Sequence, residues 1–274
     1  MSKSTQPPNT PNASQFFNYR YPPFADTFEI HDPWQSASDT LMTQRALALI
    51  RQGKSLAIYG EAGTGKSMLV KAIADQLDIK TYRIAMVPYG GLKPSVIMRE
   101  LCEAFGIDVS GRKSCLCRLA KNFQRTTDNP FPVIIIDDAH TMLNQSFIDL
   151  CSLLHDAKSR TSASSIILIG QPVLKKMIEL DIFAPVRTRL ACLFMMPRLT
   201  HEETIEFIQF RLKIAQANQN IFDEQAMECI AADANGNRRI IMNIATLCLE
   251  EAARRKEKII TTEIVTAVNM EQIS

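Results

Sequence analysis

The sequence predicts an α/β protein in which helices cover both faces of a parallel sheet, followed by a small all-helical domain. Short apolar runs alternate with amphipathic helical patterns as far as Pro197. These runs are apolar at nearly every position, which is typical of parallel strands buried on both faces. After Pro197 only helical patterns remain. We therefore expect an α/β domain over residues 16–198 and a helical domain over residues 199–274.

Each helix and strand of the α/β part is predicted from the spacing of its apolar residues and from the residues that end it. A helical pattern that begins near Thr40 ends before Gly53, and a short apolar strand follows. The same alternation continues along the chain. It predicts strands at 55–59, 80–86, 133–137, 165–170 and 192–196, and helices at 40–51, 68–77, 94–105, 114–123, 145–156 and 173–180.

The two ends of the chain differ from this pattern. Residues 1–15 are mostly Pro, Ser, Thr, Asn and Gln without periodicity, so we expect a disordered tail. The stretch THEE at 200–203 fits a capping box at the start of a helix. Apolar residues at helical spacing then predict helices at 204–215, 225–233, 238–255 and 262–268.

The composition argues against a protein that is basic overall, a disulfide-stabilised protein and a membrane-spanning protein. Lys plus Arg number 31 against 29 Asp plus Glu, so any nucleic-acid surface must be local. The seven cysteines form no CxxC pair and lie mostly in apolar patterns, as expected of reduced thiols in a cytosolic protein. No apolar stretch approaches a membrane span and the start does not resemble a signal sequence, so we expect a cytoplasmic protein.

A glycine-rich loop between a predicted strand and a predicted helix indicates phosphate binding. The loop matches GxxxxGK[ST] at every fixed position. Its glycines allow backbone N–H groups to point at phosphates, and the helix N-terminus adds positive potential. Lys66 is expected to reach the β and γ phosphates of ATP, and Ser67 to hold Mg²⁺. The loop consists of Gly60, Glu61, Ala62, Gly63, Thr64, Gly65, Lys66 and Ser67.

Two aspartates end the apolar run FPVIIIDDAHTM at 131–142. Charges at the carboxyl end of a buried strand are expected at a ligand crevice. We assign Asp137 to the Mg²⁺ side and Asp138 to the attacking water, with helix capping as the alternative for Asp138. His140 is interpreted as a hydrogen-bonding core or helix-start residue. The other histidines have no ligand partner at useful spacing, so no metal beyond Mg²⁺ is implied.

These motifs resemble those of the AAA+ ATPases, and among them the ExeA-like group, over residues 16–255. The stretch FFNYRYPPF at 16–24 is similar to that group's N-terminal segment, which lies near the adenine. ILIGQP at 167–172 is similar to its fourth strand and implies that Gln171 is the sensor 1 residue. The stretch from Val186 to Glu203 resembles the segment before the lid and implies that Arg189 is the arginine finger, with Arg187 in reserve. GNRRIIMNIA resembles the sensor 2 segment and implies that Arg239 faces the nucleotide.

Asp138 departs from the family pattern, because AAA+ members usually carry Glu there. The shorter side chain sets the carboxylate about 1.5 Å further back from the water. We expect slow ATP hydrolysis, as in a switch that stays ATP-bound for long periods. A nucleotide-binding module without catalysis is the alternative that this residue leaves open.

The resemblance also implies partners. An arginine finger acts on a neighbouring subunit, so we expect an ATP-dependent ring or filament. Loops at 87–95 and 110–114 carry Tyr89, Lys93 and Lys113, which are suited to contacts with double-stranded DNA, although an ordinary surface loop fits as well. We favour a DNA-binding transposition helper of the MuB or TniB type that recruits or activates a transposase. A cytoplasmic ATPase of a secretion or pilus assembly system is the alternative.

Overall fold

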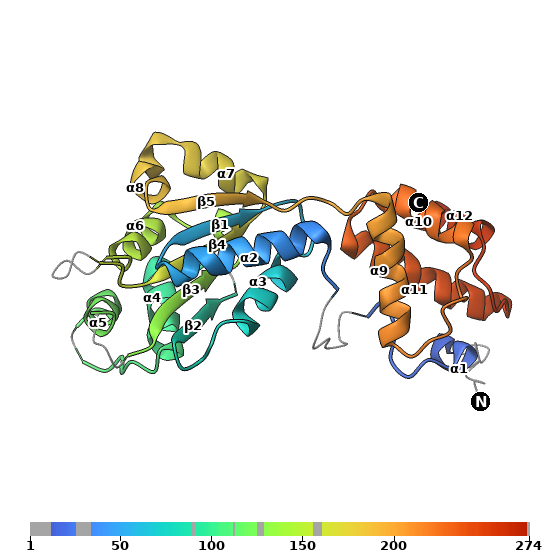
Figure 1. The fold of residues 1–274 in the computed structure, drawn as a ribbon, viewed down its shortest axis with the longest axis horizontal. Helices are drawn as coiled ribbons and strands as arrows, with labels where there is room; N and C mark the ends of the chain where they lie inside the picture. Colours follow the sequence, from blue (N-terminus) through green and yellow to red (C-terminus); the bar gives the residue numbers. More distant parts are fainter. Residues whose placement is uncertain are drawn as a thin grey trace, which may run out of the picture. The chain divides into compact units, whose positions relative to one another are not determined.

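The computed structural model describes residues 12–25, 34–88, 91–111, 113–124, 129–155 and 161–272 (Figure 1). The chain divides into two compact units. One is the α/β unit, residues 37–197. The other is the helical unit, made of the described residues up to Ser36 together with those from Arg198 onward.

The α/β unit contains the predicted parallel sheet. The order is β2-β3-β4-β1-β5, and every neighbouring pair is parallel. Strand β1, which leads into the glycine-rich loop, lies between β4 and β5. The strands are β1 (Ser55–Tyr59), β2 (Tyr82–Val87), β3 (Phe131–Ile136), β4 (Ser165–Gly170) and β5 (Leu190–Met195).

Helices cover both faces of this sheet, which explains why its three inner strands β1, β3 and β4 are mostly buried and almost entirely apolar. In β3, Val133 and Ile135 pack with α2 and α3, whereas Ile134 and Ile136 belong to the core on the opposite face. One face is covered by α2 (Ala37–Arg51) and α3 (Lys66–Asp75). The other layer comprises α4 (Pro94–Ala104), α5 (Cys115–Asn122), α6 (Asn144–Ser152), α7 (Pro172–Glu179), η2 (Asp181–Phe183) and α8 (Ala184–Arg187).

The helical unit contains the four helices expected after Pro197. Thr200 and Glu203 form the predicted capping box at the start of α9, and each accepts a backbone N–H of the other. Asp223 and Asn237 cap the next two helices. The helices are α9 (His201–Ile214), α10 (Glu224–Ala234), α11 (Arg238–Arg255) and α12 (Thr262–Gln272).

The N-terminal segment packs in the helical unit, whereas the sequence pattern had placed residues 16–198 in one domain. A short helix, α1 (Ala13–Phe17), begins within the stretch expected to be a disordered tail. Phe24 is buried against Phe222, and Arg211 of α9 donates to the backbone carbonyls of Pro23 (2.6 Å) and Ala25 (3.0 Å). These aromatic and hydrogen-bonding contacts join the segment to α9 and its neighbours. They could not be predicted from the periodicity of the sequence, because they connect residues far apart in the chain.

Candidate nucleotide site

The glycine-rich loop connects β1 to α3 in a conformation that requires glycine at several positions. Gly63 and Gly65 have φ angles of 80° and 98°, in the region that side chains other than glycine disfavour. A Cβ at Gly60 would lie 2.9 Å from the carbonyl oxygen of Met196. The loop therefore runs close to the end of β5 and leads directly into the first turn of α3. This is the strand, loop and helix arrangement on which phosphate binding depends.

Lys66 and Ser67 lie where the loop enters α3. The Nζ of Lys66 donates to the carbonyl oxygens of Gly60 (2.8 Å) and Glu61 (2.6 Å). The Oγ of Ser67 donates to Oδ2 of Asp137 at 3.0 Å. Parallel strands bring their carboxyl ends to one edge of the sheet, so two motifs 70 residues apart in the chain meet there. A hydroxyl and a carboxylate together match the oxygen ligands that Mg²⁺ prefers.

Asp138 has an unusual backbone conformation, with a φ of 47°. Its N–H donates to Oδ1 of Asp137, and its carbonyl accepts from the N–H and Oγ1 of Thr141. Asp138 precedes the single turn η1 (Ala139–Thr141), but its side chain makes no capping hydrogen bond. The carboxylate is about half exposed, at 49%. It is therefore available to a ligand, and Asp is one of the few residues that tolerate this left-handed conformation.

His140 is a mostly buried, hydrogen-bonding residue in the turn η1, as expected, but its position between two of the candidate site residues was not predicted. Its Nδ1 accepts from the backbone N–H of Gln171 at 3.4 Å and lies 3.8 Å from Oδ1 of Asp138. The Gln171 side chain is exposed at the start of α7. Gly170 permits this approach, because a Cβ there would lie 3.3 Å from that of His140. The one sequence feature that could have indicated this role of His140 is its position two residues after Asp138.

The candidate arginines are distinguished by their contacts. The guanidinium of Arg187 donates to the carbonyl oxygens of Ile178 (3.3 Å) and Glu179 (2.8 Å), at the end of α7. The exposed side chain of Arg189 makes no hydrogen bond or ion pair with any described residue. Burial raises the pKa of the Cys151 thiol and the charge of Arg189 opposes that shift, which places Arg189 near α6. Arg187 therefore joins α8 to the carboxyl end of α7, and Arg189 is available to another molecule.

The remaining candidates lie on exposed parts of the molecule or outside the described residues. Arg239 is exposed in the first turn of α11, in the helical unit, with its backbone N–H bonded to Asn237. Lys93 is exposed at the N-cap position of α4, and Lys113 is exposed just before α5. Tyr89 lies outside the described residues.

The described part of the chain contains no group of three or more His, Cys, Asp and Glu side chains that could hold a metal ion. None of its helices is both long enough and apolar enough to cross a membrane. The loop and the Ser67–Asp137 pair are the residues that fit Mg²⁺ and ATP.

Comparison with known proteins agrees with this arrangement. Residues 50–178 match the family model described as an AAA domain. Cdc6p from Pyrobaculum aerophilum superposes with a TM-score of 0.71 at 17% identity, covering 91% of this chain and 70% of that one. The chain has the AAA+ fold. Other solved structures that it resembles are ORC1 from Aeropyrum pernix in complex with DNA (TM-score 0.66, 17% identity, 92% and 69% coverage) and the RuvB Holliday junction branch migration motor from Thermotoga maritima (0.61, 18%, 86% and 69%).

Two curated proteins resemble the chain in sequence. General secretion pathway protein A from Aeromonas hydrophila is 24% identical over 264 residues, or 92% of this chain. ATP-dependent DNA helicase PIF3 from Trypanosoma brucei brucei is 26% identical over 225 residues, or 79% of this chain. The chain spans only 47% of the first relative and 27% of the second. In sequence the chain is thus similar to an AAA domain over residues 50–178 and to general secretion pathway protein A over most of its length.

Proposed function

We propose that this protein binds ATP with Mg²⁺ in its glycine-rich loop and hydrolyses it slowly. The observation that carries the proposal is the 3.0 Å hydrogen bond between Ser67 and Asp137, because it joins the phosphate loop to the acidic end of β3. Lys66 and the loop N–H groups bind the phosphates, and Ser67 and Asp137 hold the metal ion. When bound, Mg²⁺ neutralises charge that develops on the phosphates.

Asp138 acts as the general base that polarises the attacking water, and Gln171 orients the phosphate end of the nucleotide. Two features support this division of roles: the Asp138 carboxylate is half exposed, and its side chain does not cap η1. The short side chain and the fixed left-handed backbone both limit how closely the carboxylate approaches the water, which supports slow turnover.

The direct test is Asp138→Asn, with exposed Asp75→Asn of α3 as the matched control. We expect turnover to fall by about 10²- to 10⁴-fold, the usual contribution of a general base, while ATP affinity is retained. The control should hydrolyse ATP at the parent rate. Unchanged turnover in Asp138→Asn would show that the carboxylate has no catalytic role.

We further propose that ATP drives assembly into a ring or filament in which Arg189 reaches the nucleotide of a neighbouring subunit. The exposed Arg189 side chain, without a partner among the described residues, supports this assignment. Arg239 acts within its own subunit as the sensor 2 residue.

For the biological role we propose a DNA-binding transposition helper similar to the MuB and TniB types, which recruits or activates a transposase on double-stranded DNA. Support comes from the fold shared with an ORC1 protein bound to DNA and with a branch migration motor. Lys93 and Lys113 are exposed cations suited to phosphate contacts. The specific observation that favours the alternative, a secretion or pilus assembly ATPase, is the similarity to general secretion pathway protein A.

Binding to a random-sequence duplex, measured with no nucleotide, with ADP and with a non-hydrolysable ATP analogue at two salt concentrations, separates these roles. A DNA-binding helper should bind only with the ATP analogue, and should bind more weakly at high salt and in Lys93→Ala than in the control Lys176→Ala. If the nucleotide binds but DNA does not in any state, the secretion or pilus role is favoured.

A further inference from the structure

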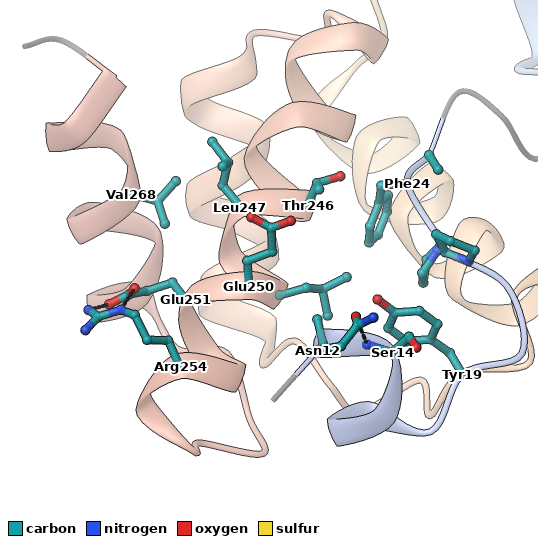
Figure 2. Close-up of a pocket in the computed structure, with 15 residues that line it drawn as sticks. Asn12, Ser14, Tyr19, Phe24, Thr246, Leu247, Glu250, Glu251, Arg254 and Val268 are labelled. Atoms are coloured by element: carbon teal, nitrogen blue, oxygen red, sulfur yellow. Dashed lines mark hydrogen bonds and ion pairs between the residues drawn. The ribbon is translucent and has the colours of Figure 1, made fainter. Parts of the chain in front are cut away.

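The helical unit contains a pocket of about 940 Å³ between the N-terminal segment and helices α11 and α12 (Figure 2). Its walls combine the rings of Tyr19 and Phe24 with apolar residues of the two helices, such as Val268. In Figure 2 the carboxylate of Glu250 lies between the N-terminal segment and α12. A pocket of this size accommodates several residues of a peptide, which is more than a single amino acid needs.

The charge of Glu250 is uncompensated among the described residues, unlike that of its neighbour. Glu251 accepts hydrogen bonds from Arg254 and Arg255, whereas the Glu250 side chain has no hydrogen bond or ion pair there. Burial and the charge of Glu250 together raise the pKa of the Tyr19 hydroxyl. The Glu250 carboxylate is therefore close enough to Tyr19, on the N-terminal segment, to influence its ionisation. The charged side chains that line the pocket are Glu250, Glu251 and Arg254, and since Arg254 pairs with Glu251, the charge of Glu250 remains as a net charge of −1.

This pocket does not have the properties of a nucleotide site. Glu250 lies about 16 Å along the axis of α11 from Arg239, the residue proposed to face ATP, at about 1.5 Å per residue. A free carboxylate repels phosphate groups. The second carboxylate of the pocket, Glu251, is held by Arg254 and Arg255, and the described residues include no group of three or more His, Cys, Asp and Glu side chains that could hold a metal ion.

We propose that this pocket binds an arginine or lysine side chain presented by a segment of a partner protein. The cationic head pairs with Glu250 and lies against the face of the Tyr19 ring. The aliphatic stem of the same side chain packs on the apolar wall near Phe24. The proposal does not depend on whether the partner belongs to a transposition or a secretion system, nor on the ATPase mechanism.

The test is selection of a random twelve-residue peptide library displayed on phage against the full-length protein. The selected peptides are then synthesised, and their affinities are measured by fluorescence anisotropy. We expect Arg or Lys to be enriched at one position of the selected peptides. Replacing that residue by neutral citrulline or glutamine should weaken binding at least tenfold, as should Glu250→Lys.

The matched control is Glu228→Lys, which reverses an exposed charge on α10 outside the pocket and should leave the affinity unchanged. Glu250 is exposed, so both variants should fold, and thermal melting will check this. The proposal is overturned if no basic residue is enriched or if Glu250→Lys binds the peptides as tightly as the parent. Peptides that bind only after removal of residues 1–11 would also overturn it, because they would assign the pocket to the chain's own N-terminus.

Discussion

The α/β unit and the helical unit use charged side chains in opposite ways. At the carboxyl edge of the sheet the Asp138 carboxylate is half exposed and lies 3.8 Å from His140, and nearby the exposed Arg189 side chain makes no hydrogen bond or ion pair with a described residue. In the helical unit, Arg211 is buried and bonded to backbone carbonyls, and Glu251 is held by two arginines. Charges at strand ends are thus available to ligands, whereas most charges between helices stabilise the packing. Glu250 differs from Arg211 and Glu251 because it lines a pocket without a hydrogen bond or ion pair to a described residue, and for that reason we infer a ligand for it.

The largest effect is expected from replacing Arg189, the residue proposed to reach the nucleotide of a neighbouring subunit. Arg189→Ala should lower ATP turnover by about a thousandfold, the lower range for an arginine finger, without changing ATP affinity or thermal stability. Steady-state hydrolysis at a protein concentration that supports assembly measures this. Arg187→Ala is the comparison, because that side chain already bonds the end of α7. It should cost about 1 kcal/mol of stability and change turnover less than tenfold.

The opposite result would exchange the roles assigned to Arg187 and Arg189. If Arg187→Ala abolishes turnover and Arg189→Ala does not, then Arg187 exchanges its contacts in α7 for a neighbour's nucleotide, and Arg189 is a solvated surface residue.

A smaller effect, on the free energy of unfolding, is expected from replacing Arg211, the buried arginine of the helical unit. Arg211→Met leaves the carbonyls of Pro23 and Ala25 without their charged donor and should lower the free energy of unfolding by about 3 kcal/mol. Urea unfolding followed by the fluorescence of Trp34, the single tryptophan of the chain, reports this directly because Trp34 packs on Phe207.

The control for Arg211 is Lys213→Met, an exposed cation on the same helix, whose effect should stay within about 0.5 kcal/mol. Equal losses in the two variants would mean that Arg211 does not anchor the N-terminal segment, and the grouping of that segment with the helical unit would lose its main support.

The smallest effect is a pH dependence at Glu251. Hydrogen bonds from Arg254, opposed by burial and reinforced by Arg255, lower the pKa of its carboxyl to about 2, from an ordinary value near 4.5. A carboxyl with a lowered folded-state pKa stabilises the fold above its unfolded pKa, and this contribution is lost as the pH falls toward the folded value. The parent should therefore melt at a higher temperature than Glu251→Gln near pH 6, and the difference should shrink between pH 4.5 and 2. A difference that is constant over this range would contradict the ion pair.

Much of the α/β unit could be predicted from local sequence. The apolar runs at 55–59 and 165–170 coincide with β1 and β4, and the phosphate loop follows β1 as expected. Asp137 was recognised because an acid after a buried strand is informative by itself. The link from His140 to Gln171 was not predictable, since it depends on the distance between two strand ends and on the absence of a side chain at Gly170.

The strands, the glycine-rich loop and the capping box at Thr200 could be predicted from the sequence, because each depends on residues close together in the chain. Three features became visible only in the folded chain: where the N-terminal segment packs, which of Arg187 and Arg189 is free of intramolecular hydrogen bonds among the described residues, and that Glu250 lines a pocket. These features are contacts between residues distant in sequence. Their energies come from burial and hydrogen bonding that exist only after the elements have packed together.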